Sequence, residues 1–348
     1  MNFYVRKIFK EWLLLAAIIA TITTSFYIKK FPSYSYSDFE ILYILLILFT
    51  IIKGIENSNF FFKIKDFVEK GRFLPLKLVV ITYFLSMFIT NDVALLLIVP
   101  LTVTLNIDNK GKIVILEALA ANAGSALTPF GNPQNIFIYW FYHIDYIKFI
   151  KVISLFSIVS LCIIAVCAVF LHVEKKQTAV DYKKDIHKSF YIHILFLFMT
   201  ILIIFHLLPI ELGFIPLIVY FILQKENFKI DYILLLTFFF FFGFTDNVKY
   251  ILNIRFENSG QVFLFSSVIS QFISNVPSAL LISDFTGNWK ALLWGVNVGG
   301  YGNLVGSLAN LIAYRIYNSH TKDKFFLIKF TTAGYFMFFL FSIIYFVK

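Results

Sequence analysis

Apolar runs separated by short polar segments follow one another along the whole chain. A helix needs about 20 apolar residues to cross the hydrocarbon core of a bilayer, so runs of about this size predict membrane-spanning helices. Simple runs of this kind occupy residues 12–28, 39–52, 146–173, 190–208, 210–223, 230–244 and 325–347. The pattern predicts an all-α polytopic membrane protein in which 12–28 is a retained first helix and not a cleaved signal peptide.

Two further apolar runs carry polar residues at their centres. Thr90-Asn91-Asp92 lies in the middle of residues 73–107, and Ser274-Asn275-Val276-Pro277-Ser278 lies inside residues 262–285. Polar side chains at membrane depth are costly unless protein or a water-filled cavity surrounds them, so by default they mark a binding site or a pathway. We predict that each run is a re-entrant helical hairpin with these polar residues at its tip.

Two other runs are longer than one simple span and are interrupted by glycine and proline. Residues 113–142 contain the segment from Gly124 to Pro133, and residues 292–317 contain the segment from Gly299 to Gly306. Such interruptions are tolerated at membrane depth only where protein encloses the freed backbone groups or where they line a cavity. We therefore predict two broken transmembrane helices.

These elements recur in the same order in an N-terminal half, 1–173, and a C-terminal half, 190–348. Before each hairpin lies a short charged segment, 56–72 or 249–258, which predicts an amphipathic surface helix. A constant offset of 175 matches Asn122, Gly124, Gly131 and Asn135 with Asn297, Gly299, Gly306 and Asn310, in that order. We interpret the halves as repeats of one unit.

The basic residues predict how the chain is oriented. Hairpins that return to the side they enter leave about nine full spans, and an N-terminus in the cytoplasm then places 22 of the 30 lysines and arginines inside. This bias has the sign that the positive-inside rule expects for the cell (inner) membrane. The two broken helices would run in opposite directions, and inverted repeats with broken helices are typical of secondary transporters.

Composition supports the membrane assignment and excludes several other classes of protein. The chain is 59% hydrophobic and 20% aromatic, with a mean hydropathy of +0.82. Its net charge of +10 is spread over many segments, so a nucleic-acid partner is not expected. Cys162 and Cys167 lie in one apolar run and predict neither a disulfide nor a metal site. No hydrolase motif is present, so an enzyme is not expected.

The polar segments resemble those of the ion transporter superfamily of citrate-transporter-like permeases. This superfamily includes divalent anion:sodium symporters, arsenite efflux pumps and sodium/proton antiporters. The matching segments are Thr90-Asn91-Asp92, Gly131-Asn132-Pro133-Gln134-Asn135, Ser274-Asn275-Val276-Pro277, and Gly299-Gly300 through Gly306-Ser307-Leu308-Ala309-Asn310. The resemblance implies an elevator movement of hairpins and broken helices. It also implies one sodium ion at Thr90, Asn91 and Gly124, and another at Ser274, Asn275 and Gly299.

We therefore predict a secondary active transporter that moves a small anion across the bilayer, coupled to sodium or protons and using no other cofactor. An arsenite-efflux-like or sodium/proton antiporter-like carrier and an ion channel stay open as alternatives, as does a homodimer. The candidate substrate- and ion-binding residues are Thr90, Asn91, Asp92, Gly124, Thr128, Asn132, Asn135, Ser274, Asn275, Ser278, Gly299, Gly300, Asn303 and Asn310.

Two acidic residues are candidates for proton coupling. Asp92 has no acidic counterpart in the second hairpin, where Val276 follows the asparagine, and it is either a coupling group or an N-cap of the second arm. Glu117 lies two turns before the first break and is either a proton-relay residue or a solvated residue near a helix start. The sequence leaves both pairs of alternatives open.

Overall fold

The structure is a computed structural model of the chain, and it describes residues 12–58, 68, 73–173, 187–223, 232–252, 254–321 and 323–348. The described residues form fifteen α-helices and one short 3-10 helix, and no strand occurs among them. The first helices are α2 (Trp12–Ile28), α3 (Tyr36–Glu56), α5 (Leu74–Ile89), α6 (Asn91–Thr104), α7 (Lys110–Ala126), α8 (Pro133–Phe141) and α9 (Tyr146–Phe170). The all-α prediction is confirmed.

The second part of the chain is also helical. Its elements are α10 (Ser189–Ile204), η1 (Ile210–Gly213), α11 (Phe214–Leu223), α12 (Tyr232–Ile251), α13 (Ser259–Ile273), α14 (Asn275–Ser283), α15 (Trp289–Gly299), α16 (Leu308–His320) and α17 (Phe326–Val347). Several helices begin at side chains that satisfy the first free backbone amides. Asp145 accepts from the amide of Lys148 at the start of α9, and Asn258 accepts from two amides at the start of α13.

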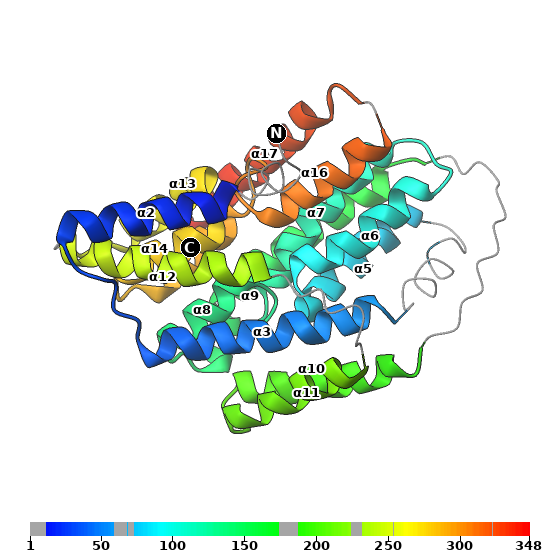
Figure 1. Ribbon diagram of the computed structural model, residues 1–348. Coiled ribbons are helices and arrows are strands. Elements are labelled where there is room, and N and C mark those ends of the chain that lie inside the picture. The colour runs from blue at the N-terminus through cyan, green and yellow to red at the C-terminus, as the bar shows by residue number, and fades with distance from the viewer. Residues whose placement is uncertain are drawn as a thin grey trace, which may run out of the picture.

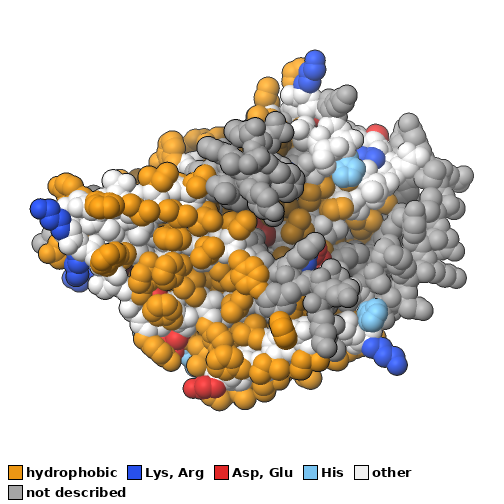
Figure 2. Space-filling view, viewed as in Figure 1, with side chains coloured by type: hydrophobic (Ala, Val, Ile, Leu, Met, Phe, Trp, Pro, Cys, Tyr) orange, Lys and Arg blue, Asp and Glu red, His pale blue; other side chains and the backbone are white. Residues whose placement is uncertain are grey.

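Apolar helices of membrane-spanning length occur in the described part of the chain. By length and composition α9, α12 and α17 are each sufficient to cross a bilayer, and six further apolar helices in the described ranges have only 10–17 residues. Figure 2 shows hydrophobic side chains gathered in a broad band over the face that contains α2, α12 and α3. An exposed apolar surface of this extent is expected of a protein whose solvent is lipid.

Both polar-centred runs fold into pairs of helices joined at one residue. Thr90 separates α5 from α6, and Ser274 separates α13 from α14. The two residues have nearly the same backbone, with φ and ψ of 71° and 153° at Thr90 and of 78° and 157° at Ser274. This region is almost exclusive to glycine and costs about 1–3 kcal/mol for other residues, so both tips are strained in the same way.

Both overlong runs are broken as predicted. Residues 127–132 separate α7 from α8, and residues 300–307 separate α15 from α16. Pro133 occupies the first position of α8, where its missing amide hydrogen would have had no partner within the helix. Gly302 lies in the second break with φ of 87°, a conformation that L side chains rarely adopt.

The hairpins and broken helices pack both within and between the halves. The first arms pack within their own half, α5 on α7 and α13 on α15. The second arms pack on the broken helices of both halves, α6 on α7 and α16, and α14 on α15 and α8. Around this centre α2 packs on α12, while α10 and α11 pack on α3 at the edge opposite α17 (Figure 1). The breaks therefore lie where the two halves meet.

One predicted element is wrong and another lies outside the described residues. The segment 249–258 is not a surface helix, because Lys249–Ile251 is the last turn of α12 and residues 254–258 are not helical. The amide of Phe256 donates to the carbonyl of Phe285 at 2.8 Å, and Thr286 Oγ1 donates to the carbonyl of Phe256 at 2.8 Å. These backbone groups bond to the loop after α14 instead of forming a helix. Most of 56–72 lies outside the described residues.

Candidate functional site

Four asparagines link the two broken helices crosswise. Asn122 Nδ2 on α7 donates to Asn310 Oδ1 on α16 at 2.8 Å, and Asn297 Nδ2 on α15 donates to Asn135 Oδ1 on α8 at 3.0 Å. The other hydrogens of the two donor amides bond within their own helices, to the carbonyls of Ala118 and Leu293. All four asparagine side chains are buried. Each half therefore completes the broken helix of the other.

The acceptor asparagines also hold the backbone of the breaks. Asn135 Nδ2 donates to the carbonyls of Ser125 at 3.3 Å, Ala126 at 3.0 Å and Thr128 at 3.1 Å. Asn310 Nδ2 donates to the carbonyls of Gly300 at 2.9 Å and Asn303 at 3.1 Å. A break exposes carbonyls at the C-terminus of the first half-helix, and a buried amide satisfies several of them at once.

Side chains in the breaks anchor the hairpins just before their tips. Thr128 Oγ1 donates to the carbonyl of Met87 at 2.7 Å, and Asn303 Nδ2 donates to the carbonyl of Gln271 at 3.0 Å. Gln271 returns the contact, because its Nε2 donates to the carbonyl of Gly299 at 2.7 Å. The hairpin tips are therefore fixed against the breaks.

The tip asparagines point into the same buried region. Asn91 Nδ2 donates to Asn122 Oδ1 at 3.2 Å, and the backbone amide of Asn275 donates to the carbonyl of Gly306 at 3.0 Å. A Cβ built on Gly300 would lie 3.1 Å from Asn275 Nδ2 and 3.3 Å from Asn122 Oδ1. The absence of a side chain at Gly300 thus leaves room where the second tip meets an asparagine of the first half.

The predicted glycines Gly124 and Gly299 serve close helix packing below the tips. A Cβ on Gly124 would lie 2.0 Å from the carbonyl oxygen of Tyr83 and 2.5 Å from Ser86 Oγ. A Cβ on Gly299 would lie 2.5 Å from Ser270 Oγ. The structure places both glycines against the first arms of the hairpins, α5 and α13.

Three other predicted residues make mostly local contacts, and Asn132 Nδ2 also donates to Asn297 Oδ1 in the other half at 3.4 Å. Asn132 is the N-cap of α8, and its side chain accepts from the amide of Asn135 at 2.9 Å. Asn132 Nδ2 also donates to Ser125 Oγ at 3.2 Å. Ser278 Oγ donates to the carbonyl of Ser266 at 2.7 Å and so joins the two arms of its hairpin. Ser274 Oγ donates to Asn275 Oδ1 at 3.3 Å.

A cavity of about 480 Å³ opens beside the first tip. Thr90 and Asp92 lie on its wall together with Lys53, Glu56 and Arg315, which the sequence did not indicate. Lys53 Nζ lies 2.7 Å from Glu56 Oε2. Thr90, and not Asp92, occupies the N-cap position of α6, and Asp92 lies in the first helical turn. Cationic side chains from α3 and α16 therefore face the same space as the hairpin tip.

Glu117 is fully buried, so it is not a solvated residue near the helix start. Thr102 Oγ1 on α6 donates to Glu117 Oε1, while Glu117 Oε2 has no hydrogen-bond partner among the described residues. A buried carboxyl group with one unsatisfied oxygen is costly in its charged form.

Across the described ranges no group of three or more histidine, cysteine, aspartate or glutamate side chains could hold a metal ion.

Asn122 and Asn297 were not among the predicted site residues, although they donate both crosswise hydrogen bonds. Their constant offset of 175, already visible in the sequence, was the signal that could have identified them.

Comparison with known sequences identifies the family. The profile of a family described as citrate transporter matches residues 6–286, which is more than half of the chain. The chain belongs to the citrate transporter family. Transporters of this family are integral membrane proteins, which agrees with the apolar helices of the structure.

Two relatives resemble this citrate transporter family member over most of their length. An uncharacterized transporter of Methanocaldococcus jannaschii is 34% identical over 304 residues, which are 84% of this chain and 84% of the relative. The inner membrane protein YbiR of Escherichia coli is 31% identical over 341 residues, which are 89% of this chain and 88% of the relative. The chain is therefore a membrane transporter, as the sequence predicted.

Proposed function

We propose that this protein is a secondary active transporter that moves a small anion, coupled to sodium or protons. The observation that carries the proposal is the crosswise pairing of Asn122 with Asn310 and of Asn297 with Asn135. It joins two broken helices from different halves around one buried polar centre. Substrate sites of secondary transporters lie at such interfaces between repeats, where broken helices meet.

The hydrogen bonds themselves support an internal repeat. An offset of 175 relates Asn122 to Asn297 and Asn135 to Asn310, so each crosswise bond corresponds to the other. The same offset relates Thr128 to Asn303. An offset of 184 relates Met87 to Gln271, whose carbonyls accept from Thr128 and Asn303. Two offsets that reproduce contacts, and not only residue types, favour repeats of one structural unit.

The lengths of the hairpin arms support the proposal that both hairpins are re-entrant. The arms α5, α6, α13 and α14 have 16, 14, 15 and 9 residues, which is less than the roughly 20 residues of a full span. Strained tips with polar residues would then lie near the midplane, and about nine full spans would remain. We propose that the N-terminus is cytoplasmic and that the membrane is the inner membrane, as the name of YbiR suggests for that relative.

An anion fits the polar groups at this centre. The amide side chains of Asn91 and Asn275 supply hydrogen-bond donors, and α8 and α16 both begin near it, where the partly positive ends of helices favour negative charge. The cavity beside Thr90 adds Lys53 and Arg315 on its wall. We propose that a small anion enters by this cavity from the cytoplasmic side, because Lys53 and Arg315 belong to the basic segments that the positive-inside rule assigns to that side.

Asp92 favours a second candidate function. A carboxylate on the wall of the cavity suits a cation or a proton better than an anion, as in an arsenite-efflux-like or sodium/proton antiporter-like carrier. We infer that Asp92 is a coupling group in either case. Asp92→Asn keeps the size of the side chain and removes its charge. Uptake measured against a pH gradient should lose its proton dependence, and an unchanged dependence would contradict this role.

Reconstitution into proteoliposomes tests the proposed function. A carrier should accumulate a labelled small anion against its concentration gradient when a sodium or proton gradient is imposed. A channel would only let the anion equilibrate. The variant N122L/N297L, which removes both crosswise donors, should abolish accumulation. Accumulation that is absent for every anion tested, with downhill flux retained, would overturn the carrier assignment.

A further inference from the structure

Two clefts lie between α9 and α17, one at each end of these helices. We call this pair of clefts the α9–α17 seam. Residues of both helices line each cleft, and the floor comes from the helices packed beneath, α15 at one end and α7 at the other. The first cleft combines the start of α9 and α15 with the end of α17, and the second combines the end of α9 with the starts of α7 and α17. In the proposed repeat α7 corresponds to α15 and α9 to α17. The start of one of the paired helices α9 and α17 and the end of the other therefore line each cleft, together with the start of α7 or α15.

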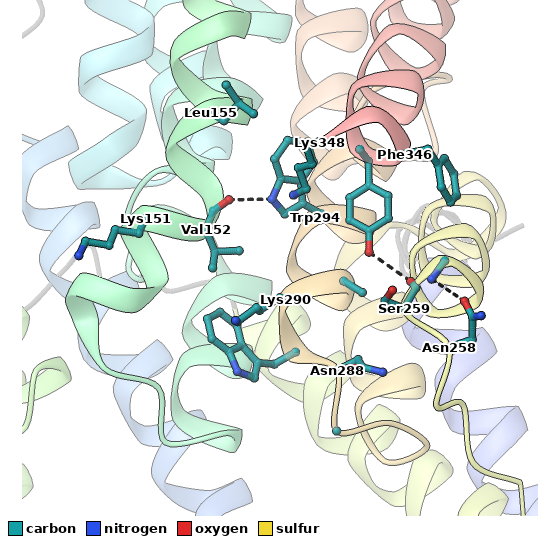
Figure 3. Close-up of a pocket in the computed structure, with 15 residues that line it drawn as sticks. Lys151, Val152, Leu155, Asn258, Ser259, Asn288, Lys290, Trp294, Phe346 and Lys348 are labelled. Carbon is teal, nitrogen blue, oxygen red and sulfur yellow. Dashed lines mark hydrogen bonds between the residues drawn. The ribbon is translucent and has the colours of Figure 1, made fainter.

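The first cleft is a cavity of about 830 Å³ with lysines and aromatic rings on its wall. Lys348 Nζ lies 3.4 Å from the centre of the Trp294 ring and 4.8 Å from that of Tyr345. Lys290 at the start of α15 lies over Trp289 at 5.9 Å. Figure 3 shows Lys348 beside Trp294, with Lys151 on the far rim and its amine turned away from the cavity.

The walls of this cavity are held by hydrogen bonds that cross between helices. Trp294 Nε1 donates to the carbonyl of Val152 at 2.7 Å, and the hydroxyl of Tyr345 donates to the carbonyl of Ser259 at 3.2 Å (Figure 3). Asn288 does not cap α15 with its side chain. Because the side chain of Asn288 does not accept from the first amides of α15, their partial positive charge adds to that of the lysines.

The second cleft is an apolar groove of about 680 Å³ with lysines at its end. Ile163, Leu171, Phe336 and Met337 belong to its largely apolar lining. Lys112 in the first turns of α7 and Lys329 in the first turn of α17 supply the charge. Lys329 also contacts Asp323 at 3.1 Å, a contact that leaves half of its side chain exposed.

The lengths of the helices place these lysines at the two levels of the lipid headgroups. The 25 residues of α9 extend about 37 Å, and the 22 residues of α17 extend about 33 Å. The hydrocarbon core is about 30 Å thick, so both helices cross it from end to end. Cations at both ends of two helices whose middle turns carry exposed apolar residues, such as Ile158 on α9 and Phe339 on α17, match molecules that have an anionic head and apolar chains.

We propose that the α9–α17 seam binds anionic phospholipids, one at each end. The phosphate lies against Lys290 and Lys348 at one end and against Lys112 and Lys329 at the other, and the acyl chains follow the apolar surface between α9 and α17. Partial burial lowers the pKa of the Lys348 amine to about 8, and a phosphate beside it favours its charged form. The proposal rests on the membrane location and is independent of the transported substrate.

Native mass spectrometry of the purified protein in detergent tests this proposal. Phosphatidylglycerol is titrated against the protein, with phosphatidylcholine and inorganic phosphate as parallel arms. The variant K290Q/K348Q alters one end and K112Q/K329Q the other, while K29Q/K30Q removes the same charge at the end of α2. Because one basic residue near an anionic lipid is worth about fivefold in affinity, each seam variant should weaken one site by about 25-fold.

The expected result is two strong phosphatidylglycerol sites, of which each seam variant loses one and the control loses none. Phosphatidylcholine should bind weakly, and inorganic phosphate should not displace the lipid. An equal loss in K29Q/K30Q, or displacement by phosphate, would overturn the assignment to a lipid. So would a dimer that forms without lipid and is abolished by the seam variants, because a second copy would then cover the seam. Unchanged melting temperatures in detergent establish that the variants are folded.

Discussion

Asn122 and Asn310 lie 188 positions apart in the chain and share a hydrogen bond of 2.8 Å between their buried side chains. The bond has a counterpart at 3.0 Å between Asn297 and Asn135. Replacing Asn310 by leucine should leave one amide hydrogen of Asn122 and the carbonyls of Gly300 and Asn303 without this partner. A buried unsatisfied polar group costs about 1–3 kcal/mol, and the unfolding free energy in mixed detergent micelles should fall by at least that amount.

A double-mutant cycle separates the Asn122–Asn310 pair from the other contacts of these residues. N122L, N310L and the double variant should give a coupling energy of about 0.5–3 kcal/mol, because the residues are in direct contact. The pair Asn122 and Asn135, which share no hydrogen bond, provides the comparison. Equal coupling in both cycles would show that the crosswise bond is not a specific link.

Gly124 and Gly287 differ in the space around them. A Cβ on Gly124 would lie 2.0 Å from the backbone oxygen of Tyr83, whereas nothing lies within 4 Å of a Cβ on Gly287. Gly124→Ala should therefore separate α7 from α5, lower the melting temperature and reduce transport, and Gly287→Ala should be close to neutral. Steady-state uptake and thermal melting of both variants check this. A neutral Gly124→Ala would contradict the close packing of α5 on α7.

Thr90 combines a strained backbone with a hydroxyl group beside the cavity. Glycine relieves a strain of about 1–3 kcal/mol at this backbone but loses about 0.5–1 kcal/mol to the entropy of the unfolded chain. We expect Thr90→Gly to be about 1 kcal/mol more stable than Thr90→Ala. If the hydroxyl binds the coupling ion, both variants should lose any stabilisation by sodium, and Thr90→Ser should keep it. The measurement is the melting temperature with and without sodium.

Glu117 and Thr102 form a buried pair between α7 and α6. Thr102→Val should destabilise the protein by about 1–3 kcal/mol, because it removes the hydrogen bond to a carboxyl group that is fully buried. Glu117→Gln keeps an acceptor for Thr102 and should be neutral or stabilising. The double variant T102V/E117L replaces both partners by apolar groups and should be more stable than T102V alone. If it is less stable, the carboxyl group has a further partner.

Residue patterns along the chain predicted the local elements because their causes are local. A polar triplet within an apolar run must be enclosed, which placed Thr90 and Ser274 at the joints between helices. Proline and glycine interrupt helices wherever they cluster, which placed both breaks. The segment 249–258 was predicted wrongly because its alternation of charged and apolar residues also suits a loop that bonds to Thr286 and Phe285.

The partners across the site could not be predicted in the same way. Met87 and Gln271 receive hydrogen bonds at their backbone carbonyls, which every residue possesses, so no residue type marks them. Lys53 and Arg315 join Thr90 at one cavity only because α3 and α16 meet α6 in space. The resemblance implied that Gly124 faces Thr90 and Asn91, and only the fold shows that it packs against the first arm at Tyr83.

The crosswise asparagines also have a consequence for how the protein is made. Asn122 is synthesised 188 residues before its partner Asn310. Until then its amide has no acceptor on α16, and Asn135 likewise waits for Asn297. The polar centre is thus complete only after the second broken helix has been made. Nascent chains that stop before residue 310 should therefore leave one hydrogen of the Asn122 side-chain amide without its acceptor.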